Sequence, residues 1–117
     1  MSRAGAIQTY SGTVSITSGQ TVGTDNPATR NGYIVGIMID APDLTGATYT
    51  IAILGDTGFT QFSKASLTKA VKSWVGADAN NVLLKIPMTS TTIVQITSAS
   101  SEGSTRSIPY KLLIQGT

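Results

Sequence analysis

The chain has 117 residues and contains no histidine and no cysteine, whereas 13 Ser and 18 Thr make hydroxyl side chains its dominant polar class. Histidine is the usual general base near neutral pH and the commonest metal ligand, and the cysteine thiolate is a favoured ligand and nucleophile. The composition therefore excludes much of ordinary enzyme and metal chemistry. The formal net charge of +2 is too small to indicate a nucleic-acid partner.

Hydrophobic residues make up 40% of the chain, which is enough for one buried core in a domain of this length. No apolar run approaches the length of a membrane span, and the first residues lack the apolar stretch of a signal peptide. We therefore expect one domain without a membrane partner, made in the cytoplasm and folding without disulfides.

The first predicted strand covers residues 9–17, where Tyr10, Val14 and Ile16 alternate with hydroxyl residues. A period of two is typical of a half-buried strand. Residues 1–8 precede it and are predicted to be a flexible N-terminal arm, with the folded domain spanning 9–117. A polar loop is expected over 23–32. Residues 33–39 are apolar at almost every position, which predicts a central strand covered on both faces.

Next, residues 47–54 alternate again, and the turn sequence at 55–58 indicates a hairpin that returns through 59–62. Further strands are predicted at 82–86, 92–98 and 108–115. About seven to eight short antiparallel strands separated by turns are typical of an all-β protein with a single β-sandwich or jelly-roll domain.

Residues 63–75 allow two interpretations. The spacing of one helical stripe, which would give a short helix near residues 66–75, is followed by Leu67, Ala70, Val71, Trp74 and Val75. The serines and threonines of this segment weaken helix propensity, and every other segment is predicted to be β. A loop followed by a strand is the alternative, and the pattern alone does not decide between them.

Catalytic and metal-binding motifs are weak. Ser66 and Lys69 match the spacing of a Ser–Lys nucleophile, but the supporting motifs are missing and a solvated polar segment explains them. Asp40, Asp43 and the segment 78–81 offer oxygen ligands for calcium, yet both segments are better explained as turns. We therefore predict no catalytic residue, no cofactor and no metal.

Lys64, Lys69 and Lys72 lie in an interval between Asp56 and Asp78 that holds no acidic residue. They form either a positive patch for an acidic partner or a solvated face that keeps the protein soluble. Trp74 follows the lysines and would suit a stacking platform for sugars or single strands. A tryptophan buried in the core is the preferred interpretation.

The resemblance to a known family is carried by the segments 49–58, 62–67, 84–88, 92–97 and 106–114. In their order and residue pattern they resemble the small β-sandwich head decoration (cement) proteins of tailed bacteriophages. The resemblance covers about the last two thirds of the chain and contains no diagnostic motif. It implies a non-enzymatic protein that sits outside the major capsid protein lattice, often as a trimer, and helps to hold expanded heads together.

The resemblance implies that the partners are the major capsid protein and the chain itself, as a homotrimer. The expected location is the outer capsid surface of a virion, after synthesis of the protein in the host cytoplasm. The predicted contact residues come from the arm and the basic segment: Ser2, Arg3, Ala4, Ile7, Lys64, Lys69 and Lys72. Two alternatives remain open. One is a carbohydrate- or receptor-binding module of the tail-fibre or lectin-like kind, and the other is a phage tail or neck structural protein.

Overall fold

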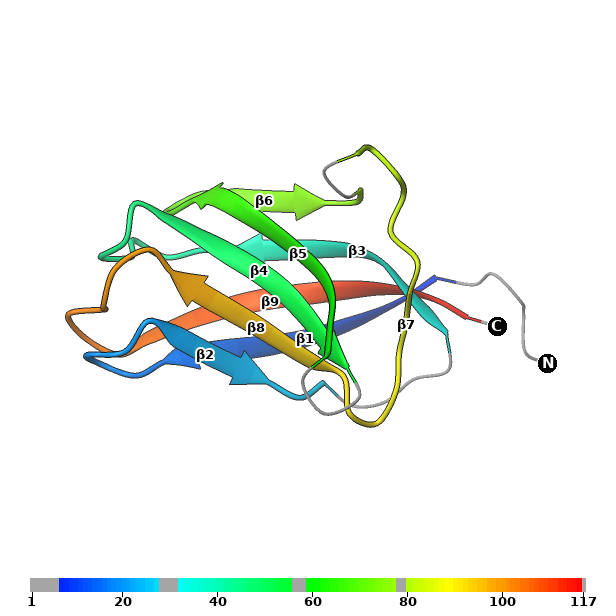
Figure 1. The fold of residues 1–117 in the computed structure, drawn as a ribbon, viewed down its shortest axis with the longest axis horizontal. Helices are drawn as coiled ribbons and strands as arrows, with labels where there is room; N and C mark the ends of the chain where they lie inside the picture. Colours follow the sequence, from blue (N-terminus) through cyan, green and yellow to red (C-terminus); the bar gives the residue numbers. More distant parts are fainter. Residues whose placement is uncertain (1–6, 28–31, 56–58, 78–79, 117) are drawn as a thin grey trace.

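Two antiparallel sheets stacked face to face make up the computed structural model, which describes residues 7–27, 32–55, 59–77 and 80–116 (Figure 1). Sheet A has the order β1-β9-β3-β6, with β7 also pairing with β3, and sheet B has the order β2-β8-β4-β5. The strands are β1 (Ile7–Ile16), β2 (Val22–Asp25), β3 (Tyr33–Asp40), β4 (Thr48–Gly55), β5 (Phe59–Thr68), β6 (Lys72–Val75), β7 (Ile86–Pro87), β8 (Ile93–Ser98) and β9 (Arg106–Gln115). The predicted all-β sandwich is confirmed.

The core lies between the sheets and follows from strand alternation. In β9, Ile108, Leu112 and Ile114 point inward and are essentially fully buried, while the residues between them face the outer surface. In β8, Val94 and Ile96 do the same from the opposite sheet. Successive side chains of a strand point to opposite faces, so one apolar face on each sheet is sufficient to build the shared interior.

The ambiguous segment 63–75 is not helical. β5 continues to Thr68, a turn with Ala70 at a φ of 60° follows, and β6 begins at Lys72. The predicted helix near 66–75 is therefore wrong. The alternative of a loop followed by a strand is right for the strand β6, but residues 63–68 belong to β5 rather than to a loop. Leu67 is buried under sheet B and Val75 under sheet A, so the apparent helical stripe consists of residues from two different layers.

Three other predictions need correction. β2 lies within the segment predicted to be a polar loop and pairs with β8. The predicted strand 82–86 is reduced to an isolated bridge between Ala77 and Leu83 and the start of β7. β3 is not covered on both faces, because Met38 on its outer side is 44% exposed. A bulge between Ile34 and Gly36 shifts its alternation, which keeps Ile34 and Ile37 both inside.

The hairpin predicted at residues 55–58 is confirmed by the antiparallel pairing of β4 with β5, where Gly55 faces Phe59. Its turn residues 56–58 lie outside the described residues. The first strand begins at Ile7 rather than at residue 9, since Ile7 and Gln8 pair with Gln115 and Ile114 of β9.

Candidate interaction surfaces

The structure places the predicted arm contacts only in part. Ser2, Arg3 and Ala4 lie outside the described residues. Ile7 is the first residue of β1, and its side chain is 54% exposed on the outer face of sheet A. Ile7 is thus the one predicted arm contact within the described residues, and it lies in an edge strand of the sandwich.

The three predicted lysines do not form one patch. Lys69 donates to the Leu44 carbonyl (3.2 Å) and forms an ion pair with Asp43 (2.8 Å), an arrangement that holds the pKa of the Asp43 carboxyl below its ordinary value. Lys72 lies opposite Asp40 at the outer face of sheet A. Lys64 lies in β5, one of the two edge strands of sheet B, and is the cross-strand partner of Ile51 in β4. Lys69 therefore lies with Asp43 and Leu44, apart from the other two, while Lys64 and Lys72 lie on strands of different sheets.

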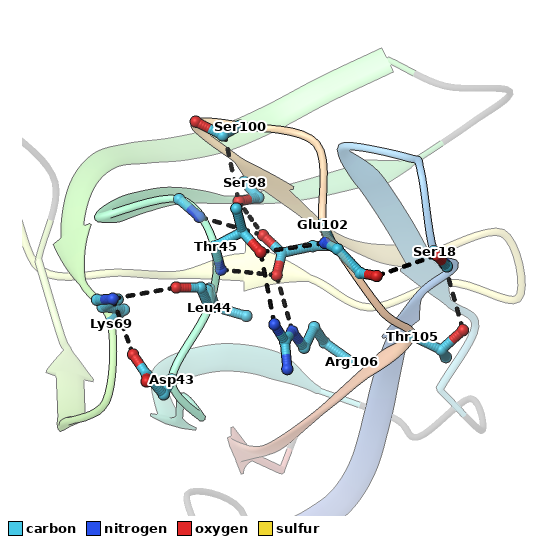
Figure 2. Close-up of polar contacts among 12 residues, drawn as sticks. Ser18, Asp43, Leu44, Thr45, Lys69, Ser98, Ser100, Glu102, Thr105 and Arg106 are labelled. Atoms are coloured by element: carbon cyan, nitrogen blue, oxygen red, sulfur yellow. Dashed lines mark hydrogen bonds and ion pairs between the residues drawn. The ribbon is translucent and has the colours of Figure 1, made fainter.

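A buried carboxylate, missed by the sequence analysis, closes one end of the sandwich. Glu102 is 1% exposed, and its oxygens accept bonds from the backbone N–H groups of Thr45 (2.9 Å) and Gly46 (3.3 Å), the Ser98 hydroxyl (2.7 Å) and Arg106 Nε (3.0 Å). Figure 2 shows these donors converging from three segments. Burial on its own would raise the pKa of Glu102, but the four donors outweigh it and lower the pKa to about 2.

Backbone hydrogen bonds of Glu102 connect it to a further loop, between β1 and β2. Gly19 N–H donates to the Glu102 carbonyl (2.8 Å), and Glu102 N–H donates to the Gln20 carbonyl (3.0 Å). The carboxylate thus joins the β3–β4, β8–β9 and β1–β2 connections, which lie together on the left of Figure 1. We call Glu102 with Thr45, Gly46, Ser98 and Arg106 the loop clamp. Its four hydrogen bonds satisfy the buried carboxylate and hold these connections together.

A second internal bond links the two sheets. Tyr110 of β9 donates to Asp25 of β2 over 2.6 Å, and its ring lies 6.3 Å from that of Tyr10. Burial and the neighbouring Asp25 carboxylate together raise the pKa of the Tyr110 hydroxyl. Gly12 leaves the necessary room, because a Cβ at that position would meet the Tyr110 hydroxyl at 2.6 Å.

Trp74 is not in the core, contrary to the sequence-based prediction. It is 57% exposed and lies on the outer face of sheet A, where it is the cross-strand partner of Met38. A Cβ at Gly36 or at Gly76 would collide with the indole ring. The ring therefore lies against the backbone of β3 and of the segment after β6, with much of its remaining surface open to solvent.

Two grooves border the Met38–Trp74 pair. One, of about 390 Å³, has Met38, Asp40, Lys72, Pro109 and Lys111 among its lining residues. The other, of about 460 Å³, is lined by Val35, Lys64, Trp74, Val75, Gly76, Ala77, Asn81 and Leu83. We call this surface, with Met38 and Trp74 at its centre and the two grooves beside them, the Trp74 face. Its second groove reaches from sheet A to Lys64 of β5 in sheet B. It combines exposed apolar side chains with lysines.

No group of three or more Asp, Glu, His or Cys side chains within the described ranges is arranged to hold a metal ion. The Ser66–Lys69 pair suggested by the sequence is engaged otherwise, since the Lys69 ammonium group contacts Asp43 and Leu44. Ser66 itself has a φ of 63° at an irregularity of the β4–β5 pairing. In the part of the chain that the structure describes, no helix has the length and apolar character required to cross a membrane.

Searched by sequence, the chain matches no protein-family model and no curated protein. By structure it is similar to a chain of the cyanophage Pam1 capsid asymmetric unit, at 17% identity and a TM-score of 0.61, with 100% of this chain and 89% of that chain covered. This likeness shows a shared fold.

Two further solved structures are less similar. The infectious bursal disease virus VP2 subviral particle matches at 16% identity and a TM-score of 0.38, with 95% of this chain and 33% of that chain covered. The Yersinia pseudotuberculosis-derived mitogen matches at 18% identity and a TM-score of 0.36, with 95% and 86% covered. At these TM-scores neither adds to the functional argument.

Proposed function

We propose that the protein is a non-enzymatic decoration (cement) protein of a phage capsid, which binds the major capsid protein on the outside of the head and stabilises the shell. The observation that carries the proposal is the fold shared over the full length with a chain of a phage capsid asymmetric unit. Because 89% of that chain is covered, the neighbour is a capsid component of similar size, and it has no large additional domain that this chain lacks.

The physical properties of the chain support this role. A protein that strengthens a shell must remain folded on an exposed surface, and here the core and the loop clamp provide rigidity without cysteine. The Trp74 face offers apolar area and positive charge outside the core, as a surface that meets a partner would. The N-terminal residues 1–8 are a further proposed contact, through addition to a neighbouring sheet.

Self-association as a homotrimer on the shell is part of the proposal. β5 and β6 are terminal strands of their sheets, and unpaired edges are surfaces that closed cyclic packing buries. Native mass spectrometry of the purified protein, together with a reconstruction of decorated heads, tests this. Monomer in solution combined with isolated single copies on the particle would contradict the trimer.

A carbohydrate- or receptor-binding module is the second candidate, and one observation favours it. Trp74 is half-exposed in a groove that also contains Asn81 and Lys64, and an exposed indole beside polar side chains is a common way to bind a sugar ring. Binding to a glycan array, abolished by Trp74→Ala, would support this candidate over a capsid role.

The decisive experiment begins with the phage that encodes the chain. Mass spectrometry of purified virions should detect the protein at a fixed ratio to the major capsid protein. Heads from a gene-deletion phage should bind the purified protein on their outer surface and then withstand higher temperature. A protein that is absent from virions and does not bind such heads would refute the proposal.

A further inference from the structure

The Trp74 side chain packs against the backbone of two glycines. Glycine at both Gly36 and Gly76 creates the flat surface on which the indole lies, since a Cβ at either position would collide with the ring. Met38 contributes to the same outer face directly across the strand pair. The fold thus fixes a large aromatic side chain in a defined orientation while leaving 57% of its surface exposed.

Two further apolar side chains at this surface are exposed. Leu83 is 80% exposed in the same groove, and Met38, the cross-strand partner of Trp74, is 44% exposed. Exposed apolar side chains that are scattered singly need no explanation, but a contiguous group around an ordered tryptophan is the typical composition of a binding hot spot.

The charges at this surface are mostly positive. Lys64 lines the Trp74 groove, and Lys72 and Lys111 line the Met38 groove, where Asp40 is the sole acid among the described lining residues. The other described acids have internal partners: Asp25 accepts from Tyr110, Asp43 from Lys69, and Glu102 from the loop clamp. The Trp74 face therefore complements a partner that is apolar at its centre and acidic at its edges.

A protein segment fits this surface better than a nucleic acid does. Single-stranded nucleic acids are held by two or more stacked aromatic side chains along a basic channel. Each groove has one aromatic side chain in its described lining, Trp74 in one and Tyr110 in the other, but Tyr110 is buried and donates to Asp25. Trp74 is therefore the one exposed aromatic side chain among the described lining residues. The aliphatic surroundings of Met38 and Leu83 instead suit an aliphatic or aromatic side chain from a protein.

We propose that the Trp74 face is the docking surface for an acidic segment of the shell protein, which places an apolar side chain on the indole and carboxylates near Lys64, Lys72 and Lys111. This inference rests on the proposed function for the identity of the partner. Of the predicted run of three lysines it keeps Lys64 and Lys72 but not Lys69, and it places the contact on a surface assembled from β3, β5, β6, β9 and the segment after β6.

The test is binding of purified variants to heads from the gene-deletion phage, measured as occupancy against protein concentration at several salt concentrations. Trp74→Ala should weaken binding at least tenfold. Met38→Glu, which adds a carboxylate at an exposed position and does not disturb the core, should weaken it similarly by repelling the acidic segment. Lys72→Ala combined with Lys111→Ala should make binding less sensitive to salt. The matched control combines Thr50→Ala and Gln95→Ala on the outer face of sheet B and should bind like the wild type.

The possible outcomes separate the two proposals. Wild-type binding together with equal binding by Trp74→Ala and Met38→Glu would overturn the docking surface and leave the decoration role intact. Failure of the wild type to bind heads would overturn both. Tighter binding of the wild type to a sulfated polysaccharide or to single-stranded DNA than to heads would also overturn the assignment of a protein partner.

Discussion

The loop clamp buries a charged side chain, whereas the Trp74 face exposes apolar ones. At the clamp, the buried Glu102 carboxylate accepts four hydrogen bonds from within the chain. At the Trp74 face, a tryptophan, a methionine and a leucine are exposed beside lysines. The first arrangement stabilises the fold, and the second adds little stability while offering a surface to another molecule. Substitutions at the two regions should therefore affect different properties.

The largest effect on stability is expected for Glu102→Ala. Its removal leaves two backbone N–H groups without their acceptor and Arg106 without its carboxylate, so the free energy of unfolding should fall by about 3 kcal/mol. Urea denaturation followed by circular dichroism measures this. Asp43→Ala is the matched control, because it removes an exposed acid from the same end and should leave the midpoint unchanged. Equal effects of the two variants would contradict the structural role of the clamp.

Acid should weaken the loop clamp through protonation of Glu102. The pKa of Glu102 lies at about 2 in the folded protein against 4.5 ordinarily. A carboxyl with a lowered pKa stabilises the fold fully above its unfolded value, and this contribution is lost as the pH falls from about 4.5 towards 2. Thermal melts over this range should show a falling midpoint in the wild type and a flatter profile in Glu102→Gln. A parallel fall in both would assign the acid sensitivity to other groups.

An intermediate loss of stability is expected for Tyr110→Phe, and Tyr49→Phe is its control. Tyr110→Phe removes the donor to the Asp25 carboxylate and should cost about 2 kcal/mol. Tyr49 is equally buried, but its hydroxyl has no hydrogen-bond partner among the described residues. Burial raises its pKa, with Ser73 near enough to oppose part of that shift. Tyr49→Phe should therefore leave the unfolding midpoint unchanged or raise it slightly, and a loss as large as that of Tyr110→Phe would show that Tyr49 has a partner.

Trp74→Ala should change stability by only about 1 kcal/mol or less, because more than half of the side chain is already in water. Differential scanning calorimetry checks this, with Leu112→Ala as the contrasting core variant that should lose about 3 kcal/mol. A loss for Trp74→Ala comparable with that of the core variant would place Trp74 among the stabilising residues and remove the contrast between the two regions.

The smallest effect is expected for Gly36→Ala, and it concerns geometry more than stability. The new methyl group should displace the indole of Trp74 from the sheet. Trp74 is the single tryptophan of the chain, so its fluorescence reports on this site alone. We expect emission to shift to longer wavelength, while Thr50→Ala on sheet B leaves it unchanged. An unaltered emission maximum in Gly36→Ala would show that the ring does not rest on Gly36.

Much of the fold could be predicted from the local pattern, because alternation along a strand records which side chains face the core. For this reason the sequence predicts strands over residues 9–17 and 92–98. The pattern failed where tertiary pairing overrode local chemistry. β2 consists of Val, Gly, Thr and Asp and has little strand signal of its own, yet it is paired with β8. The spacing of Leu67 and Val75 suggested a helix because two strands of different sheets happened to match its period.

The sequence by itself determined two properties of this protein. The lack of histidine and cysteine excludes much of ordinary catalytic and metal chemistry, and the period of two along the strands requires sheets with one buried face. Only the tertiary structure decided that Glu102 fastens loops 57 residues apart in the chain, as in its bond to Thr45. It also decided that Trp74 faces solvent. Alternation assigns neighbouring residues to opposite faces, but which face is covered depends on where the second sheet lies, and that is fixed by long-range pairing alone.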